Sequence, residues 1–371
     1  MRFSIQRENL LNPLQLIIGV VERRQTKPIL SNILVKVSDS SLWLTSTDCE
    51  IEIIGNTQLD IDVNEPGETT VPARKFSDIC RALPNEASID FNFDAENQKV
   101  LIRSGKSRFT LKTLPPDEFP NIENIKPKHK FSVQLSQLKT HIDQTHFSMA
   151  QQDVRYYLNG LLLELDKNTL KTVATDGHRL AYYESQITQS FDETIQVIIP
   201  RKGVVELSKL IEDSEQNVEV ELSDNHIRMV FPNAVFTSKL IDGRFPEYNK
   251  VIPETSDRTL VADVDLLKQS LSRASILSNE KYRGILLNIS NGILQAQAHN
   301  PEMETAEEEV EVEYTGATFE VGFNVTYVLD ALAAIKTSNV ILHFGTNNNS
   351  CLITPSDDES HCKYVVMPMR L

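Results

Sequence analysis

The sequence predicts an α+β protein built from three repeated domains, each with two helices backed by antiparallel sheets. Its 371 residues leave room for two or three domains of ordinary size. One order of helix-like and strand-like stretches recurs at intervals of roughly 125 residues. Asp176 follows Asp48 by 128 residues, and Pro200 follows Pro72 by the same 128. Solenoid repeats span only about 20–50 residues, so we predict whole domains at residues 1–125, 126–253 and 254–371.

Each copy opens with an apolar stretch at helical spacing. The first runs from Leu10 to Ile18, and Pro13 inside it predicts a kink or the first turn of the helix. Leu138 to Met149 and Leu266 to Leu277 are its counterparts. Strand-like runs follow in every copy, at residues 29–35 and 42–48, 158–163 and 172–176, and 284–289 and 293–298.

A second helix then follows in each copy. Pro72 and Pro200 stand near its start in the first two copies, where proline is favoured, and residues 322–324 stand there in the third. Between helices, residues 217–222 and 309–314 alternate apolar and polar side chains, which indicates strands with one buried face. The polar, proline-containing runs around residues 122–128 and 252–259 are read as linkers.

Composition limits the function classes. With 40% hydrophobic and 24% charged residues the chain is expected to fold, and no apolar run approaches the roughly 18–20 residues that cross a bilayer. The N-terminus carries no apolar signal region, and the four cysteines form no C-x-x-C pair, so we expect reduced thiols, a cytoplasmic protein and no membrane partner. A net charge of −15 argues against gripping nucleic acid over the whole surface.

Motifs for catalysis, cofactors and metals are missing from the sequence. It has no phosphate-binding glycine loop, no H-E-x-x-H and no metal-binding cysteine pair, and we predict neither cofactor nor metal. Asp176, His178 and Arg179 could suggest a hydrolase or nuclease. Thr47-Asp48 occupies the same place without a histidine, so the Thr-Asp pair is read as a structural turn. We therefore expect a binding surface at His178 and Arg179, not catalysis.

Basic and aromatic side chains recur at equivalent places. Arg74-Lys75 and Arg201-Lys202 fall in the first turn of the second helix, where anions are favoured. The tyrosine pair near residues 151–157 suits contact with a sugar-phosphate backbone or a base, although solvated surface is the alternative for any single cation. The tail, residues 364–371, fits a last strand, a methionine-lined groove wall, or both.

Seven segments spread over the whole chain resemble the bacterial DNA polymerase III beta subunit, the sliding-clamp family. They are residues 70–76, 147–150, 153–160, 172–180, 242–246, 276–281 and 365–371. The resemblance implies domains of the DNA-clamp type, with two chains joined head to tail in a ring of six domains around double-stranded DNA. It also implies processivity in replication without catalysis. The implied partners are the polymerase III alpha subunit, the clamp loader, and other polymerases and repair proteins that donate short peptides. A scaffold that binds proteins but no DNA is the remaining alternative.

The resemblance also implies two sets of site residues, and the charge pattern predicts a third. The DNA-contacting set is Arg24, Arg74, Gln152, Tyr156 and Tyr157. The partner-peptide set is Arg155, Leu158, Thr175, Gly177, His178, Arg179, Leu180, Pro246, Lys250, Val251, Val365, Met367, Pro368, Met369 and Arg370. Lys250 departs from the arginine of the family pattern and so loses the planar fork.

The third set forms the dimer interface. A basic strand with Lys106 and Arg108 is predicted to meet an acidic segment around Glu302 and Glu304. Phe109 is expected to pack on Ile276 and Leu277, and this apolar contact should contribute most of the stability, because exposed ion pairs contribute only about 0–1 kcal/mol each. The full set of predicted interface residues is Lys75, Lys106, Arg108, Phe109, Ile276, Leu277, Glu302 and Glu304.

Overall fold

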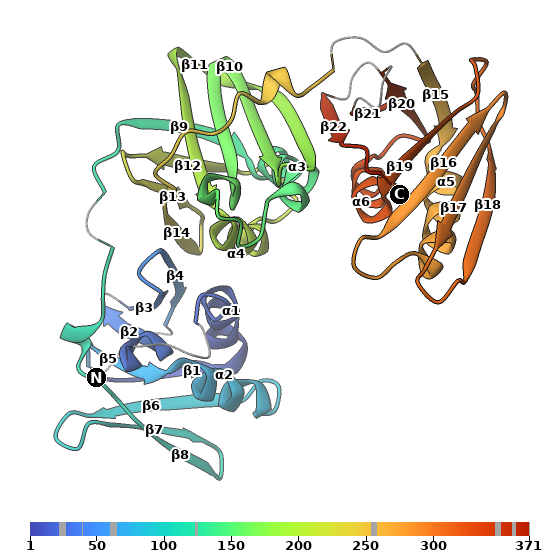
Figure 1. Cartoon of the computed structure of the whole chain (residues 1–371). Helices are drawn as coiled ribbons and strands as arrows, with labels where there is room; N and C mark the ends of the chain where they lie inside the picture. The colour runs from blue at the N-terminus through green and yellow to red at the C-terminus, as the bar shows by residue number, and fades with distance from the viewer. Residues whose placement is uncertain are drawn as a thin grey trace. The chain divides into compact units, whose positions relative to one another are not determined.

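The computed structural model describes residues 1–21, 27–38, 40–59, 65–122, 125–253, 258–345, 350–357 and 361–370. The chain folds into two compact units, and Figure 1 labels the helices and strands of both. One unit comprises residues 1–136 and 202–240, and the other comprises residues 137–201 and 241–371. The three domain ranges predicted from the sequence do not follow this division, and they stay a prediction.

The first unit contains two antiparallel sheets. A four-stranded sheet has the order β1-β6-β7-β8, and an eight-stranded sheet has the order β5-β2-β3-β4-β14-β13-β12-β9. The helices of this unit are α1 (Arg7–Ile17), α2 (Ala73–Ala82) and α4 (Arg201–Leu210) from Lys202 onward. The strands are β1 (Arg2–Gln6), β2 (Asn32–Ser38), β3 (Ser41–Thr47), β4 (Ile51–Gln58), β5 (Gly67–Pro72), β6 (Ser88–Asp94), β7 (Lys99–Ser104), β8 (Ser107–Lys112), β9 (His129–Gln134), β12 (Asn217–Leu222), β13 (His226–Val230) and β14 (Ala234–Lys239).

The second unit also contains two antiparallel sheets, ordered β10-β11-β22-β21-β20-β15 and β18-β17-β16-β19. Its helices are α3 (Leu135–Thr145) from Gln137 onward, α5 (Val264–Ala274) and α6 (Val325–Ala334). Its strands are β10 (Gly160–Thr175), β11 (Arg179–Pro200), β15 (Arg258–Asp263), β16 (Gly284–Ser290), β17 (Ile293–His299), β18 (Thr305–Glu311), β19 (Phe319–Asn324), β20 (Asn339–Phe344), β21 (Cys351–Pro355) and β22 (Cys362–Val366).

Each unit contains one place where strands far apart in the sequence join two sheets into one. In the first joint, β4 pairs with β14 and Ile51 lies opposite Ser238. In the second joint, β11 pairs with β22 and Arg179 lies opposite Val366. The partners are separated by 128 positions on both sides, since 179 − 51 and 366 − 238 are equal. The two joints therefore have the same register.

The helices bury their apolar faces against these sheets. Leu10, Leu14 and Ile17 of α1 are fully buried, as is Phe76 of α2, whose ring meets Phe91 of β6 edge-on at 5.9 Å. Burial of this kind stabilises a fold by roughly 1.5–3 kcal/mol per large apolar side chain. In the other unit, α5 packs on β17 and β18. The repeated amphipathic stretches predicted from the sequence therefore form the core-facing helices.

Three details differ from the expectations. Residues 29–31, expected at the start of a strand, lie in the tight turn Pro28–Ser31, and the strand begins at Asn32. Pro13 lies in the middle of α1, not in its first turn, and Gly55 of β4 passes so close that an added Cβ would lie 3.0 Å from Pro13 Cβ. The predicted helices ending at Met149 and Leu277 stop earlier, at Thr145 and Ala274, and continue as single tight turns. Terminal turns of this kind are common where the last α-helical hydrogen bonds are replaced.

Within the described ranges, no helix is long and apolar enough to cross a membrane. The same residues contain no group of three or more His, Cys, Asp or Glu side chains arranged to hold a metal ion. All four cysteines are free thiols.

Candidate peptide-binding site

A tight turn between β10 and β11 forms the centre of the site. Thr175 Oγ1 donates to the Arg179 carbonyl at 2.6 Å, and Asp176 Oδ1 accepts from the His178 and Arg179 amides at 2.9 and 3.0 Å. Gly177 has φ +87°, and an added Cβ would lie 2.8 Å from Arg155 Nη2. Glycine is therefore required here both by the backbone conformation and by the neighbouring guanidinium.

The first repeat contains the same turn. Thr47 Oγ1 donates to the Ile51 carbonyl at 2.8 Å, and Asp48 Oδ1 accepts from the amides of Glu50 and Ile51 at 2.9 and 2.7 Å. The structural role predicted for the Thr-Asp pair is thus confirmed. Asp176 holds a turn by the same bonds, which is the geometry of an Asx turn and not of an acid–base pair.

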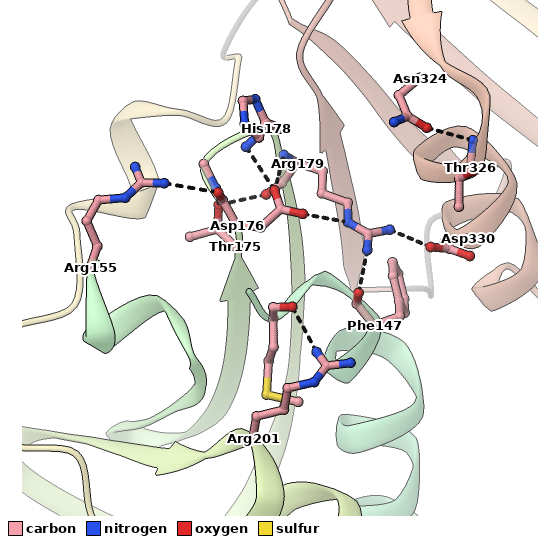
Figure 2. Close-up of polar contacts among 12 residues, drawn as sticks. Phe147, Arg155, Thr175, Asp176, His178, Arg179, Arg201, Asn324, Thr326 and Asp330 are labelled. Carbon is pink, nitrogen blue, oxygen red and sulfur yellow. Dashed lines mark hydrogen bonds and ion pairs between the residues drawn. The ribbon is translucent and has the colours of Figure 1, made fainter. Parts of the chain in front are cut away.

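Arg179 ties this turn to α6, as Figure 2 shows. Its guanidinium donates to Asp176 Oδ2 at 3.1 Å, to Asp330 of α6, and to the Phe147 carbonyl at 2.6 Å. It also lies 4.4 Å from the centre of the Tyr327 ring. With only 12% of the side chain exposed, Arg179 acts mainly as a positioning residue for the turn.

Arg155 forms the polar rim on the other side of the turn. Its guanidinium donates two hydrogen bonds to the Asp153 carboxylate, of 3.0 and 2.9 Å, and a third to the Asp176 carbonyl at 3.2 Å. These hydrogen bonds, with one from the Arg155 amide, lower the pKa of Asp153 to about 2. Asp153 was not among the site residues predicted from the sequence, although an acid two residues before an arginine is a recognisable pairing signal.

The floor of the site is apolar. Leu180 and Val365 belong to a buried cluster whose other members are Leu162, Val173, Tyr182, Ile198, Phe245 and Tyr248. Leu158 is buried as well, whereas Val251 and Met367 are 43% and 45% exposed. The Met367 amide donates to the His178 carbonyl at 2.9 Å, which fixes the start of the tail beside the turn. Exposed His178 and Pro246 complete the surface.

The last predicted residues lie along a different surface. The Met369 amide donates to the Gly322 carbonyl of β19 at 2.9 Å. Pro368, Met369 and Arg370 line a cavity of about 940 Å³ over the sheet that contains β19. Lys250 is exposed and forms an ion pair with Glu247. Their contact with a peptide stays a prediction.

The DNA-contacting set is divided between the two units. Arg24 lies outside the described residues. Arg74, in the first unit, is exposed and donates to the Val21 carbonyl at 2.7 Å. In the second unit Gln152 is exposed, and Tyr156 is 57% exposed with its ring edge-on to Tyr157 at 5.8 Å.

Most of the predicted interface residues lie at or beside two sheet edges. Arg108 and Phe109 are in β8, which ends one four-stranded sheet, and Lys106 directly precedes it. Glu302 and Glu304 directly precede β18, which ends the other four-stranded sheet. Two more members are exposed or partly exposed apolar residues beside β18, Ile276 (74%) and Leu277, and Lys75 of α2 is exposed.

Comparison with known proteins bears on the whole chain. Models of the N-terminal, central and C-terminal domains of the DNA polymerase III beta subunit match residues 1–123, 132–247 and 249–370. The beta sliding clamp of Pseudomonas aeruginosa is 52% identical and that of Escherichia coli K12 is 48% identical, each over 100% of both chains. The crystal structure of the Pseudomonas aeruginosa DNA polymerase III subunit beta superposes with a TM-score of 0.94 at 50% identity over 100% of both chains. The Caulobacter crescentus beta sliding clamp, with PEG bound, superposes with a TM-score of 0.94 at 36% identity, over 100% of this chain and 99% of that one.

Proposed function

The chain belongs to the bacterial DNA polymerase III beta subunit family of non-catalytic sliding clamps, and we propose that two copies form a closed ring around duplex DNA. The ring tethers polymerases to the template in the cytoplasm. The domain ranges 1–125, 126–253 and 254–371 are part of this proposal, and the three matched models support them.

The observation that carries the ring is the repetition of one joint. The first joint pairs the fourth strand of one repeat (β4) with the last strand of the next (β14). The second joint pairs the start of β11, which is the counterpart of β4, with the last strand of the third repeat, β22, in the same register. Among the described strands this leaves β8 and β18 each as a sheet edge with one neighbour. β8 is the last strand of the first repeat, and β18 is the counterpart of β4 in the third repeat. These two edges do not pair with each other in the described chain, so we infer that a third joint of the same kind forms between two chains.

The register of that third joint follows from the first two. Phe236 of β14 faces Ile53, and Tyr364 of β22 faces Ala181. Phe109 is the aromatic residue at the corresponding place in β8 and pairs with the preceding strand as Phe236 does.

On the other edge, Ala306 of β18 is the counterpart of Ile53 and Ala181. Each of the three lies opposite the equivalent residue of the strand before it, which is Ser46, Ala174 or Ala298. Phe109 of one chain would thus lie opposite Ala306 of the other. Arg108 would lie opposite Glu307. Glu302 and Glu304 lie just before β18, so they would add negative charge next to the proposed Arg108–Glu307 pair.

The second joint also supports the apolar contact. Phe147, in the tight turn after α3, packs on Tyr364 with ring centres 5.8 Å apart. Ile276 has the corresponding place in the tight turn after α5. Ile276 would therefore cover Phe109 of the second chain, and this contact would bury a side chain that is 74% exposed in the single chain.

The charge of the chain favours retention without tight binding. At a net charge of −15, strong attraction to DNA over the whole surface is excluded. Contacts from Arg24, Arg74, Gln152, Tyr156 and Tyr157 to the phosphate backbone would be independent of sequence, which permits sliding. Topological enclosure would supply the residence time.

The candidate peptide site would hold partners in turn. An apolar floor of Leu158, Leu180 and Val365 beside the polar groups of Arg155 and His178 suits a short extended peptide with leucine and phenylalanine anchors. The donors are the polymerase III alpha subunit, the clamp loader, and other polymerases and repair proteins.

Loading on circular DNA tests the proposal. The protein is loaded onto a nicked circle by an ATP-dependent clamp loader and then separated by gel filtration. We expect it to elute with the circle and to be lost when a restriction enzyme linearises the DNA. Equal retention on both forms contradicts enclosure, and no retention on either favours a protein-binding scaffold without DNA.

A further inference from the structure

The first joint contains a cavity at the same place as the candidate peptide site of the second joint. Its volume is about 520 Å³, and it lies in the first unit between the turn after β3, the segment that follows Phe119, and the end of β14. Thr47 and Cys49 of the turn line it, together with Lys239. The proposed function does not use this cavity.

The backbone establishes the correspondence. The Lys239 amide donates to the Glu50 carbonyl at 2.8 Å, as the Met367 amide donates to the His178 carbonyl at 2.9 Å. Glu50 and His178 occupy the same place in their two turns, since both amides are bound by the preceding aspartate. Lys239 therefore stands where the peptide site has Met367.

The segments that begin at Phe119 and Phe245 correspond as well. Phe119 is buried against Ile29, Leu30 and Leu34, just as Phe245 is buried in the cluster below the peptide site. Pro120 and Ile125 follow Phe119 at the spacing at which Pro246 and Val251 follow Phe245.

Five members of the candidate peptide site thus have counterparts that all line the cavity. They are Thr47 for Thr175, Cys49 for Gly177, Pro120 for Pro246, Ile125 for Val251 and Lys239 for Met367.

The chemistry of the cavity differs from that of the peptide site. Exposed Lys239 replaces a methionine, and exposed Lys126, which also lines the cavity, follows Ile125 directly. Among the described residues, neither ammonium group forms an ion pair. Asp224 also lines the cavity, and its carboxylate is paired with Lys128. The lining is therefore apolar at Pro120 and Ile125 and basic at its rim.

The imidazole of His226 is a further polar group in this lining. His226 lines the cavity, and its Nε2 is buried without a hydrogen-bond partner among the described residues. Burial, with Lys239 and Arg228 nearby, lowers the pKa of this imidazole. A buried imidazole nitrogen without a partner is costly. In the tautomer that carries its proton on Nε2, this nitrogen can donate a hydrogen bond to a ligand carboxylate.

We propose that this cavity binds an acidic, extended peptide segment of a partner protein, with one apolar anchor between Pro120 and Ile125 and carboxylates at Lys126, Lys239 and His226. The inference rests on the proposed function, because it takes the peptide site of the second joint as its template. It assigns the chain a second docking point with the opposite preference: acidic segments here, and leucine and phenylalanine anchors at the other site.

Cys49 provides a direct test by disulfide capture. It is partly exposed, whereas Cys80, Cys351 and Cys362 are buried. Burial also raises the thiol pKa of Cys80 to about 12 and that of Cys362 to about 11. The probe is a seven-residue peptide with a terminal thiol, in which Asp and Glu flank one Leu, and its control replaces every acid by the amide. Both are supplied as mixed disulfides with a small thiol and equilibrated with the full chain in a thiol–disulfide buffer, so that the Cys49 thiolate attacks the peptide sulfur and the small thiol leaves. Adducts are measured by intact mass.

We expect at least about tenfold more capture of the acidic peptide, since each 1.4 kcal/mol of differential binding gives a factor of ten. The variant Lys126→Gln/Lys239→Gln should reduce capture to the level of the amide peptide. The matched control is Lys36→Gln/Lys99→Gln, which removes two exposed lysines elsewhere in the same unit and should change nothing. Equal capture of both peptides, or an equal loss in the control variant, overturns the proposal.

A second probe separates this inference from the proposed function. Binding of a Leu/Phe peptide is measured in the same variants and in a chain that ends at Val366. Loss of acidic capture with intact Leu/Phe binding in Lys126→Gln/Lys239→Gln supports two independent sites. Absence of acidic capture in the unaltered chain, with normal Leu/Phe binding, refutes only the cavity. Normal acidic capture without any Leu/Phe binding refutes only the peptide site of the second joint.

Discussion

Ile276→Ala should weaken the ring without weakening the fold. The substitution removes three carbons, worth about 2.4 kcal/mol at about 0.8 kcal/mol per buried CH2. Because 74% of the residue is exposed in the single chain, about three-quarters of that value, roughly 1.8 kcal/mol, would be gained only on association. A ring contains two identical joints, so the free energy of dissociation should fall by about 3.6 kcal/mol, or about 400-fold in Kd.

Sedimentation velocity over a concentration series measures this Kd directly. Thermal unfolding of the monomeric variant should be almost unchanged, since little buried contact is lost. Ile293→Ala is the matched control, because Ile293 is also exposed (40%) but lies on β17, away from the expected contact with Phe109. A Kd for Ile276→Ala within threefold of the unaltered chain would show that β18 is not the ring interface as described.

Three further predictions concern the peptide site. Gly177→Ala should lower peptide affinity at least tenfold and cost about 1–3 kcal/mol of stability, because φ is positive and the Cβ meets Arg155; calorimetry and isothermal titration check both, and unchanged values would contradict the geometry. Asp153→Asn should reduce stability at neutral pH. The pKa of Asp153 is depressed to about 2, so its contribution to the free energy of unfolding is fully present above the unfolded-state pKa near 4 and is lost as pH falls through 2. The stabilities of the variant and the unaltered chain should therefore converge in acid. A stability difference that stays constant at every pH would contradict this. Ending the chain at Val366 should abolish binding of a Leu/Phe peptide by removing Met367 while the dimer persists in sedimentation, and retained binding would exclude the tail.

Local features of the fold could be predicted from the sequence. Helical periodicity located the six principal helices among the described residues to within a few positions, and the recurrence of Thr-Asp identified the same turn twice. Both signals reside within short windows, where periodicity and turn chemistry are decided by neighbouring residues. The helix ends at Thr145 and Ala274 were missed, since tight terminal turns keep the apolar spacing.

Long-range contacts could not be predicted in the same way. Arg179 reaches Asp330 across 151 positions, and no local pattern indicates that pair. The role of Arg179 as a support for the turn therefore emerged only from the structure. Register between distant strands such as β4 and β14 is likewise set by tertiary packing, although the apolar alternation of each strand was recognisable beforehand.

The unlike charges of the two free edges give an assembled ring a sense of direction. β8 carries Arg108, and β18 carries Glu307 and Glu309. Pairing β8 with β8 or β18 with β18 of another chain would therefore place like charges side by side. The chains must then join head to tail, with β8 of each chain against β18 of the next. A head-to-tail ring of two chains would have a twofold axis through its hole, so both Met367 sites would face the same side of the assembly. A polymerase docked at either site would then approach the DNA from that one side.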